Sequence, residues 1–405
     1  MTMTITLSAD QEVAQETILD LLRNPVGSDI VLVGAAGCGK TTLMRSTIQI
    51  VEEELGRACT LLAPTGKAAF RLSEVTGRAC STVHKALYPR VSRDKATGEL
   101  HFHSPQGVCG PGQLAVIDEA SMVGPKLYND IHQSLPARAQ VLYVGDKEQL
   151  MPVDPKAKPG SPTWGPSMEE PDAELTKVHR QQDGNPILAY ATAIREGWGN
   201  DWSQTYEHDS DQLQVYRGYQ SAMKWTLDQY KAGLDATVLT YTNRMRHKLN
   251  RDIRQGLGLY REGPVVPGDR LLVRVNNHDL QLMNGEVVTV EAVEHAVSDI
   301  CANAVVVHTE RGSFLLNLDY FNGSKNHYIE WKQKRAKRDP VWVHCDHGFA
   351  LTIHASQGSE WERVCVVVDG AVLRRTRESP DEGRRMIYTA VTRARDQLAM
   401  VWGVS

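Results

Sequence analysis

The stretch DIVLVGAAGCGKTT, from Asp29 to Thr42, decides the fold class of this chain. It opens with a short apolar run, and its second half fits the pattern G-x-x-x-x-G-K-[ST] with Gly34, Gly39, Lys40 and Thr41. The residues that follow Lys40 have a helical pattern. A glycine-rich loop between a buried strand and a helix is the setting in which backbone N–H groups cradle phosphates. The stretch therefore predicts a phosphate-binding loop in an α/β domain.

The parts of this loop have separate tasks. The glycines let the backbone approach the phosphates, Lys40 reaches the terminal phosphates, and Thr41 offers an oxygen to Mg²⁺. We expect the nucleotide to be bound by Gly34, Ala35, Ala36, Gly37, Cys38, Gly39, Lys40, Thr41 and Thr42.

Composition limits the other possibilities. The chain has 405 residues, of which 41% are hydrophobic and 23% charged, so a globular protein with more than one domain is expected. The net charge is −4, so a nucleic acid would have to bind in a local basic groove. Seven cysteines without a C-x-x-C pair argue against zinc and disulfides. No apolar run approaches the ~20 residues of a membrane span, which predicts a cytoplasmic protein without a membrane partner.

Short apolar runs that end in polar or glycine-rich turns recur along the chain. Such runs are typical of buried parallel strands, and helical patterns lie between them. One group begins at Asp29, Cys59, Leu114 and Val141, and a second group begins at Ala236, Phe349, Arg363 and Leu398. The sequence therefore predicts two α/β sheets.

Two segments interrupt this alternation. Residues 88–112 are rich in Gly, Pro and polar residues, with Thr97-Gly98 at a turn, and predict a small inserted hairpin. Residues 256–343 alternate with period two around turns at Asn284-Gly285 and Arg311-Gly312, which predicts a small antiparallel barrel.

Acidic and amide side chains follow two further strands of the first group. Asp118 and Glu119 come directly after the run LAVI, where a sheet of this kind presents its ligand crevice. Asp118 is expected to hold Mg²⁺, and Glu119 to polarise the attacking water. Gln149, in GDKEQLMPV, is a candidate for sensing the γ-phosphate, and a polar turn is the alternative interpretation.

The ordered set of motifs resembles the superfamily-one B-type DNA helicases, the RecD-like and phage Dda-like enzymes. The matching blocks run through nearly the whole chain and include LSADQEVA, the phosphate-binding loop, APTGKAA, STVHKAL, DEAS, GDKEQLMPV, LTKVHRQ, VLTYTN, LTIHASQGSEWERV and YTAVTRAR. The resemblance implies two RecA-like domains that clamp ATP and Mg²⁺ between them. It also implies that the insertions are a pin domain and an SH3-like domain.

The resemblance assigns roles to residues outside the loop. Gln11 is similar to an adenine-reading glutamine, and Glu360 to a residue near the ribose. Arg180 and Arg393 are similar to arginine fingers that the second domain supplies. Of the two arginines in YTAVTRAR, Arg393 takes the finger position, whereas Arg395 is expected to brace the local structure or meet a phosphate. An arginine at the γ-phosphate stabilises developing charge through a bidentate fork that lysine cannot reproduce.

The resemblance also implies a track for single-stranded DNA. Hydroxyls and backbone amides suit phosphate contacts without base preference, although each of these residues alone also fits a turn or a helix cap. The predicted DNA-binding residues are Pro64, Thr65, Lys67, Ser81, Thr82, His84, Thr352, His354 and Ser356.

Two features of the insertions leave alternatives open. Phe102 in HFHSP either splits the duplex by stacking on its last base pair or anchors the hairpin to the first domain. The basic run from Lys332 to Arg338 either contacts phosphates or forms a solvated face.

The resulting domain prediction has four parts: a first RecA-like domain from residues 1–87 and 113–176, a pin from 88–112, a second RecA-like domain from 177–255 and 344–405, and an SH3-like domain from 256–343. The function expected from the resemblance is ATP-dependent unwinding of DNA with 5′ to 3′ movement on a single strand. The partners would be single-stranded and forked DNA, with a single-strand-binding, replication or recombination protein as a further partner, and the active form would be a monomer.

Three other functions are open to test. A motor that strips proteins from single-stranded DNA would need the same residues without a working pin. A regulatory P-loop switch of the GTPase kind would leave the second α/β sheet unexplained, and the sequence contains no N-K-x-D block for reading guanine. A DNA-binding protein without enzymatic activity would not need the full set of phosphate-site residues.

Overall fold

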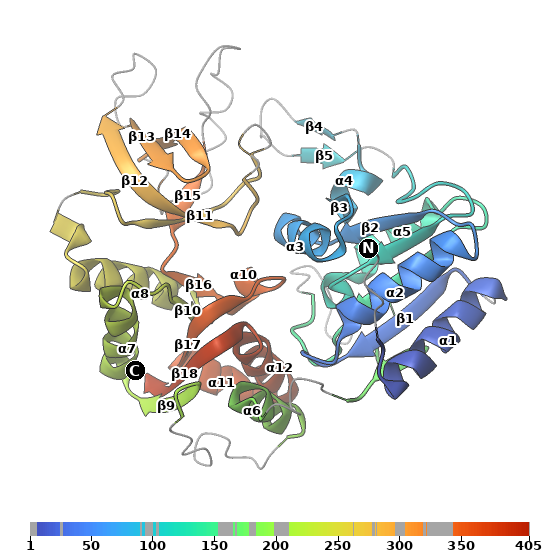
Figure 1. Ribbon diagram of the computed structural model, residues 1–405. Helices are drawn as coiled ribbons and strands as arrows, with labels where there is room; N and C mark the ends of the chain where they lie inside the picture. Colours follow the sequence, from blue (N-terminus) through green and yellow to red (C-terminus); the bar gives the residue numbers. More distant parts are fainter. Residues whose placement is uncertain are drawn as a thin grey trace. The chain divides into compact units, whose positions relative to one another are not determined.

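The structure is a computed structural model that describes residues 6–24, 27–89, 91–93, 100–102, 105–152, 165–166, 168–177, 184–197, 210–261, 263–277, 280, 282–295, 304–318, 321 and 343–404 (Figure 1). The chain forms two compact units, one from residues 1–92 and 101–195 and the other from 93–100 and 196–405. Each unit contains a parallel sheet with helices on it, which confirms the predicted pair of α/β sheets.

The first unit is built on a six-stranded sheet in which every neighbouring pair is parallel. In order across the sheet, the strands are β3 (Cys80–Thr82), β2 (Cys59–Ala63), β6 (Leu114–Ile117), β7 (Gln140–Gly145), β1 (Asp29–Gly34) and β8 (Ala173–Leu175). The helices of this unit are α1 (Ala9–Arg23), α2 (Lys40–Glu53), α3 (Gly66–Thr76), α4 (Val83–Leu87), the 3₁₀ turn η1 (Ala120–Met122), α5 (Pro125–Gln133) and α6 (Pro186–Arg195).

Both faces of this sheet are covered, as alternating side chains require. Ile30 and Leu32 of β1 join a core with α1 and α2, whereas Val31 and Val33 of the same strand join a second core with α4 and α5. The strands are therefore apolar on both faces, which explains their short continuous apolar runs.

The second unit repeats this plan with a five-stranded parallel sheet. Its strands, in order, are β16 (Ala350–Thr352), β10 (Thr237–Thr240), β17 (Trp361–Asp369), β18 (Ala394–Val404) and β9 (Leu213–Arg217). Its helices are α7 (Tyr219–Lys231), α8 (Asn243–Gly256), α10 (Ile353–Ser356), α11 (Gly370–Glu378) and α12 (Pro380–Val391). The side chains of α7 and α8 share one core with strands β10, β17 and β18.

A five-stranded antiparallel sheet is inserted after α8 and the 3₁₀ turn η3 (Leu259–Arg261). Its order is β14 (Gly312–Asn317), β13 (Ala304–Thr309), β12 (Val287–His295), β11 (Arg270–Val273) and β15 (Cys345–His347). Cys345 pairs with Val273 of β11, while the Val343 N–H donates to the Leu315 carbonyl of β14 at 3.0 Å. β15 is one edge strand of the sheet and β14 the other, so this segment joins the two edges and curls the sheet toward closure.

Two buried ion pairs tie this inserted sheet to α8. Arg246 Nη1 lies 3.0 Å from Asp346 Oδ2, and Arg254 Nε lies 2.6 Å from Asp269 Oδ1. The second Arg254 donor, Nη2, reaches Asp269 Oδ2 at 2.9 Å, so this pair is bidentate. Breaking such a pair leaves an uncompensated buried charge, which costs about 3 to 5 kcal/mol. The inserted sheet and α8 are therefore held together firmly.

Strands β4 (Val91–Arg93) and β5 (Leu100–Phe102) form a two-stranded sheet where the hairpin was expected. Three sequence predictions lie outside the described residues: the side chain of Phe102, Arg180, and the basic run from Lys332 to Arg338. Within the described part of the chain, no helix is long and apolar enough to cross a membrane.

Candidate nucleotide and nucleic-acid sites

The loop between β1 and α2 has the backbone shape that its glycines allow. Gly37 has φ 81° and Gly39 has φ 82°, values in the left-handed region that side chains with a Cβ rarely adopt. A Cβ at Gly34 would lie 2.5 Å from Cys38 Sγ. Substitution at any of these three positions would distort the loop, so the spacing of the motif follows from backbone geometry.

Lys40 lies across this loop. Its ammonium donates hydrogen bonds to the Gly34 carbonyl at 2.7 Å and to the Ala35 carbonyl at 3.0 Å. Burial alone would lower the pKa of Lys40, but the pKa is raised because the charges of its neighbours, Cys38 first and then Asp146, Glu119 and Asp118, outweigh that effect. The side chain is therefore a permanent cation.

Asp118 and Glu119 follow β6. The Asp118 N–H donates to the Leu62 carbonyl of β2, and Asp118 Oδ1 accepts from the Glu119 N–H at 2.9 Å. Burial, followed by repulsion from Glu119, raises the pKa of Asp118 to about 6. Glu119 has φ 53°, a left-handed conformation that is strained for a residue with a side chain and is found most often at functional sites.

Gln149 is buried with one polar atom unsatisfied. Its side chain is 4% exposed, and its carboxamide oxygen accepts no hydrogen bond from the residues that the structure describes. A buried unpaired oxygen costs about 1 to 3 kcal/mol, so such an atom suggests a missing partner. Gln149 follows β7, the neighbour of both β1 and β6, and its N–H donates to the Asp146 carbonyl at 3.2 Å.

These features fit a nucleoside triphosphate with Mg²⁺. The loop offers a glycine-lined backbone and a cation, and Asp118 and Thr41 provide the oxygen ligands that Mg²⁺ prefers. Bound Mg²⁺ would neutralise charge on the phosphates, and the oxygens of these two side chains would hold it.

Gln11 contacts the loop directly. Its Nε2 donates to the Cys38 carbonyl at 3.1 Å, and its Oε1 accepts from the Ser8 N–H at 3.0 Å as part of the cap of α1. Both amide atoms are thus used within the protein. In this conformation, Gln11 braces the phosphate-binding loop, and its role in reading adenine stays a prediction.

Arg393 and Arg395 differ sharply in environment. Arg393 is 2% exposed, and its guanidinium donates to the Thr389 and Ser359 carbonyls at 3.0 and 3.1 Å and to the Thr392 hydroxyl at 3.1 Å. The side chain of Arg395 is 49% exposed and lies 3.7 Å from a carboxylate oxygen of Glu362. In this conformation, all three guanidinium nitrogens of Arg393 are engaged within its own unit.

Glu360 directly follows Ser359, the residue whose carbonyl accepts from Arg393. The predicted ribose residue and the predicted finger are thus neighbours in the second unit. Gly358, just before them, has φ 72°, which its lack of a Cβ permits.

The predicted DNA-contacting residues of the first unit lie at the carboxyl ends of β2 and β3. Thr65 caps α3 by accepting from the Ala68 N–H at 3.2 Å, and Thr82 caps α4 by accepting from the Lys85 N–H at 3.2 Å. Ala63 and Thr82 are paired in the parallel register, so the two caps lie at one edge of the sheet. Pro64, Lys67 and Ser81 beside them are half-buried, and His84 is exposed.

The second unit repeats this arrangement at the end of β16. Thr352 caps α10 by accepting from the Ala355 N–H at 3.3 Å, and the His354 ring lies 5.9 Å from the ring of Tyr241. Ser356 is fully buried and donates its hydroxyl to the Ile353 carbonyl at 2.7 Å. In this conformation the Ser356 hydroxyl closes a turn, and its contact with DNA stays a prediction.

Sequence reasoning overlooked two aromatic residues near these positions. Tyr241 lies in the VLTYTN block but was not singled out, and it packs against His354. Phe70 is 47% exposed on α3, one turn after Lys67. An aromatic residue on the outer face of a helix was the signal that could have drawn attention to Phe70.

Comparison with known families and proteins agrees with this geometry. Residues 6–215 match the family described as AAA domain, and residues 347–401 match the family described as UvrD-like helicase C-terminal domain. The chain is 32% identical over 381 residues to the ATP-dependent RecD2 DNA helicase of Deinococcus radiodurans, covering 91% of this chain and 46% of that protein. It is 27% identical over 237 residues to the ATP-dependent DNA helicase dda of Enterobacteria phage T4, covering 56% and 52%.

The chain spans about half the length of these two relatives. Among solved structures, it is similar to a Bacteroides Pif1 helicase in complex with ADP-AlF3 and single-stranded DNA, with TM-score 0.51, 17% identity, and coverage of 98% and 92%. It is also similar to a Pif1 helicase from a study of DNA unwinding at forked duplex DNA, with TM-score 0.53, 18% identity and the same coverage. At these identities the likeness supports the fold.

Proposed function

The chain belongs to the AAA-domain family and to the superfamily-one B-type helicases, and from this premise we propose that it is an ATP-dependent DNA helicase. It would move 5′ to 3′ on single-stranded DNA and unwind duplex DNA, with ATP and Mg²⁺ as its cofactors. Its substrates would be single-stranded and forked DNA. A monomer would be sufficient for this activity, because both RecA-like sheets are in one chain.

The observation that carries this proposal is the charge arrangement at the phosphate-binding loop. Lys40 is held by the Gly34 and Ala35 carbonyls and feels the charges of Asp118 and Glu119, which follow β6, the strand on the other side of β7 from β1. A cation, a pair of carboxylates and a glycine-lined backbone are the groups that phosphoryl transfer to water requires. The unsatisfied oxygen of Gln149 adds an acceptor that can orient the attacking water.

Each residue has a role in the proposed reaction. Lys40 stabilises the charge of the terminal phosphates, Glu119 takes up the proton of the attacking water, and Gln149 orients that water. Asp118 and Thr41 hold Mg²⁺. Arg393 and Arg180 supply positive charges from the second RecA-like domain.

The insertions would give the motor its unwinding parts. We interpret the sheet of β4 and β5 as the pin, and the curled sheet from β11 to β15 as an SH3-like domain. The proposed domain limits are those set out above, with the insertions at 88–112 and 256–343. The strand would pass the caps Thr65 and Thr82 in one unit and Thr352 with His354 in the other.

The decisive experiment measures ATP hydrolysis with and without single-stranded DNA for the wild type and for Lys40→Ala. We expect DNA to stimulate the wild type, and Lys40→Ala to lose hydrolysis. Unwinding is then compared on duplexes with a 5′ or a 3′ single-stranded tail, of which only the 5′ tail should support it. Equal unwinding from both tails would contradict the direction, and strong GTP preference without DNA stimulation would contradict the function.

A translocase that displaces bound proteins without unwinding is the alternative. Phe102→Ala separates the two, with forked-duplex unwinding and movement along a single strand measured side by side. If Phe102 is the wedge, unwinding falls while movement is retained. Loss of both activities together would argue against a wedge and would favour an anchoring role.

A further inference from the structure

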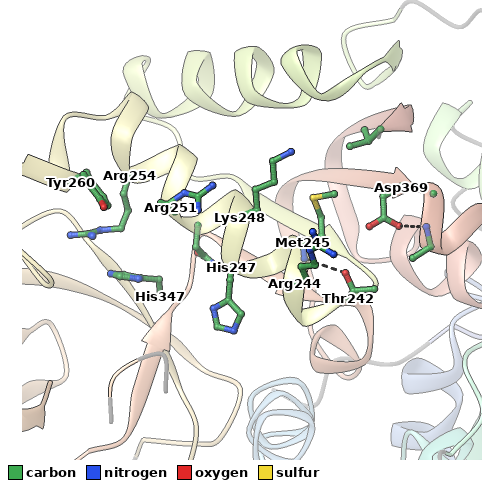
Figure 2. Close-up of a pocket in the computed structure, with 14 residues that line it drawn as sticks. Thr242, Arg244, Met245, His247, Lys248, Arg251, Arg254, Tyr260, His347 and Asp369 are labelled. Carbon is green, nitrogen blue, oxygen red and sulfur yellow. Dashed lines mark hydrogen bonds between the residues drawn. The ribbon is translucent and has the colours of Figure 1, made fainter. Parts of the chain in front are cut away.

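A pocket of about 960 Å³ lies on the second unit along α8. It extends from Thr242, which caps the helix, to Tyr260 in η3 beyond the end of the helix, as Figure 2 shows. None of the predicted site residues lines it. We call this pocket the α8 groove.

The charge of the α8 groove is strongly positive. Its charged lining consists of Arg244, Lys248, Arg251 and Arg254 against one acid, Asp369. Arg254 is neutralised by its buried ion pair with Asp269. The Asp369 carboxylate caps α11, because its Oδ1 accepts hydrogen bonds from the N–H groups of Ala371 and Val372. Arg251 Nε lies 3.0 Å from Asp252 Oδ1, so part of its charge is balanced, while its other guanidinium nitrogens extend the row. Arg244, Lys248 and these donors of Arg251 give the groove its positive charge in a chain whose net charge is −4.

These three cations form a row. Arg244, Lys248 and Arg251 are spaced i, i+4 and i+7, so they lie along one face of α8 (Figure 2). The helix rises ~6 Å between the first two and ~4.5 Å between the last two. Such a row matches a linear polyanion that presents one charge after another. Lys248 is held in place by the Tyr219 ring, whose centroid lies 3.9 Å from its Nζ.

An exposed aromatic side chain extends the row. Tyr260 is 54% exposed and lines the same pocket. A positive groove with an aromatic residue on which a base can stack is typical of single-stranded nucleic-acid sites. An acidic peptide would use the cations without needing the ring, and the stacked bases of a duplex would not reach it.

The α8 groove begins next to the proposed track. Tyr241 packs against His354, and the following residue, Thr242, lines the groove. We propose that the α8 groove binds the sugar–phosphate backbone of single-stranded nucleic acid, with Arg244, Lys248 and Arg251 on phosphates and Tyr260 under a base. This inference rests on the proposed helicase function and assigns to that function a second stretch of nucleic acid, either the continuation of the tracking strand or the displaced strand.

The test compares Arg244→Ala/Lys248→Ala/Arg251→Ala with a control that removes the same charge outside the groove. The control is the triple variant of three exposed residues, Arg217→Ala/Lys231→Ala/Arg377→Ala. Fluorescence anisotropy measures binding of a short oligothymidylate of about 8 nucleotides and a long one of about 24 over a range of salt concentrations. Forked duplexes with and without the non-tracking arm form a second set.

Each phosphate contact on a single strand contributes about 0.7 to the slope of log affinity against log salt, so three contacts contribute about 2. The groove variant should lose about 2 units of slope on the long oligonucleotide if the groove holds the tracking strand. If the groove holds the displaced strand, the groove variant should lose this salt dependence only on the fork that carries both single-stranded arms. The short oligonucleotide and the control variant should behave as wild type. Tyr260→Ala should weaken the same complex about fivefold or more without changing the slope.

Arg244→Lys/Arg251→Lys keeps the charges and should keep the wild-type slope, which separates an electrostatic role from damage to the fold. A groove variant with wild-type slopes on every substrate would overturn the inference while DNA-stimulated ATP hydrolysis by the wild type still supports the helicase. A wild-type protein that binds neither oligonucleotide would instead overturn the proposed function itself.

Discussion

Replacement of Arg393 by alanine should damage both catalysis and stability, and the structure sets the size of both effects. The guanidinium donates to the carbonyls of Thr389 and Ser359 and to the hydroxyl of Thr392. Hydrogen bonds from a charged donor contribute about 1.5 to 3 kcal/mol each, so three contribute about 4 to 9 kcal/mol. Because water can enter the space that the side chain leaves, we expect a loss near the lower limit, about 4 kcal/mol of unfolding free energy.

The catalytic effect should be of similar size. An arginine finger accelerates phosphoryl transfer by about 10³-fold or more, which corresponds to about 4 kcal/mol of transition-state stabilisation. Steady-state ATP hydrolysis and binding of a fluorescent ATP analogue are measured at a temperature where urea denaturation shows that the variant is folded. Arg393→Lys, which keeps the charge but not the bidentate fork, should retain more stability while still losing most turnover.

Arg395→Ala is the matched control. Its half-exposed side chain and 3.7 Å approach to Glu362 predict a stability change of about 0 to 1 kcal/mol. If Arg395→Ala proves the more damaging change to turnover, the finger has been assigned to the wrong arginine. If Arg393→Ala unfolds at the wild-type urea concentration, the three hydrogen bonds do not stabilise the fold and the reasoning from the structure fails.

Three other changes test separate parts of the structure. Gln149→Leu should raise the free energy of unfolding by about 1 kcal/mol, because it removes an unsatisfied buried oxygen. The same variant should hydrolyse ATP at least tenfold more slowly. Loss of stability together with activity would indicate a structural role for Gln149. Because the pKa of Asp118 is raised to about 6 in the folded protein, folding favours its protonated form. Its contribution to stability is therefore complete below about pH 4 and is lost as the pH rises through about 6. Asp118→Asn should therefore stabilise the nucleotide-free protein at pH 7 by up to about 3 kcal/mol, with no gain below about pH 4, in urea denaturation at a series of pH values. Asp269→Asn should cost about 3 to 5 kcal/mol by leaving Arg254 unpaired, whereas Asp269→Asn with Arg254→Met should recover much of that loss; equal stability of both variants would contradict the buried pair.

Much of the fold was predictable because its main strands are apolar on both faces. The run from Asp29 became β1, the run from Arg363 became β17, and the helical pattern from Lys40 became α2. Strands β8 and β9 were not predicted. Each is an edge strand with one neighbour, and burial in β8 alternates instead of running continuously. The apolar run that identified the central strands is therefore weak there.

The site was predictable where backbone geometry dictates the residue and less so where packing decides. Gly37 and Gly39 need their left-handed backbone, so the motif alone placed the loop correctly. The hydrogen bond from Gln11 to the Cys38 carbonyl and the burial of Ser356 depend on how distant segments pack, and no local pattern carries that information. The α8 groove also depends on packing. The sequence contains its cations, but it does not show that they line one pocket.

The threonines of the proposed track show why the sequence alone did not decide between a cap and a ligand. Thr82 and Thr352 are the last residues of their strands, and Thr65 lies two residues after β2. Each accepts a hydrogen bond from the backbone three residues later, and Thr242 does the same for α8. A hydroxyl has two acceptor positions and one donor, so capping uses an acceptor and leaves the proton available for a phosphate oxygen. The cap also fixes the side chain at the carboxyl edge of its sheet, where a strand of DNA would pass. Helix cap and phosphate ligand are therefore compatible roles, and the cap gives the ligand its fixed position.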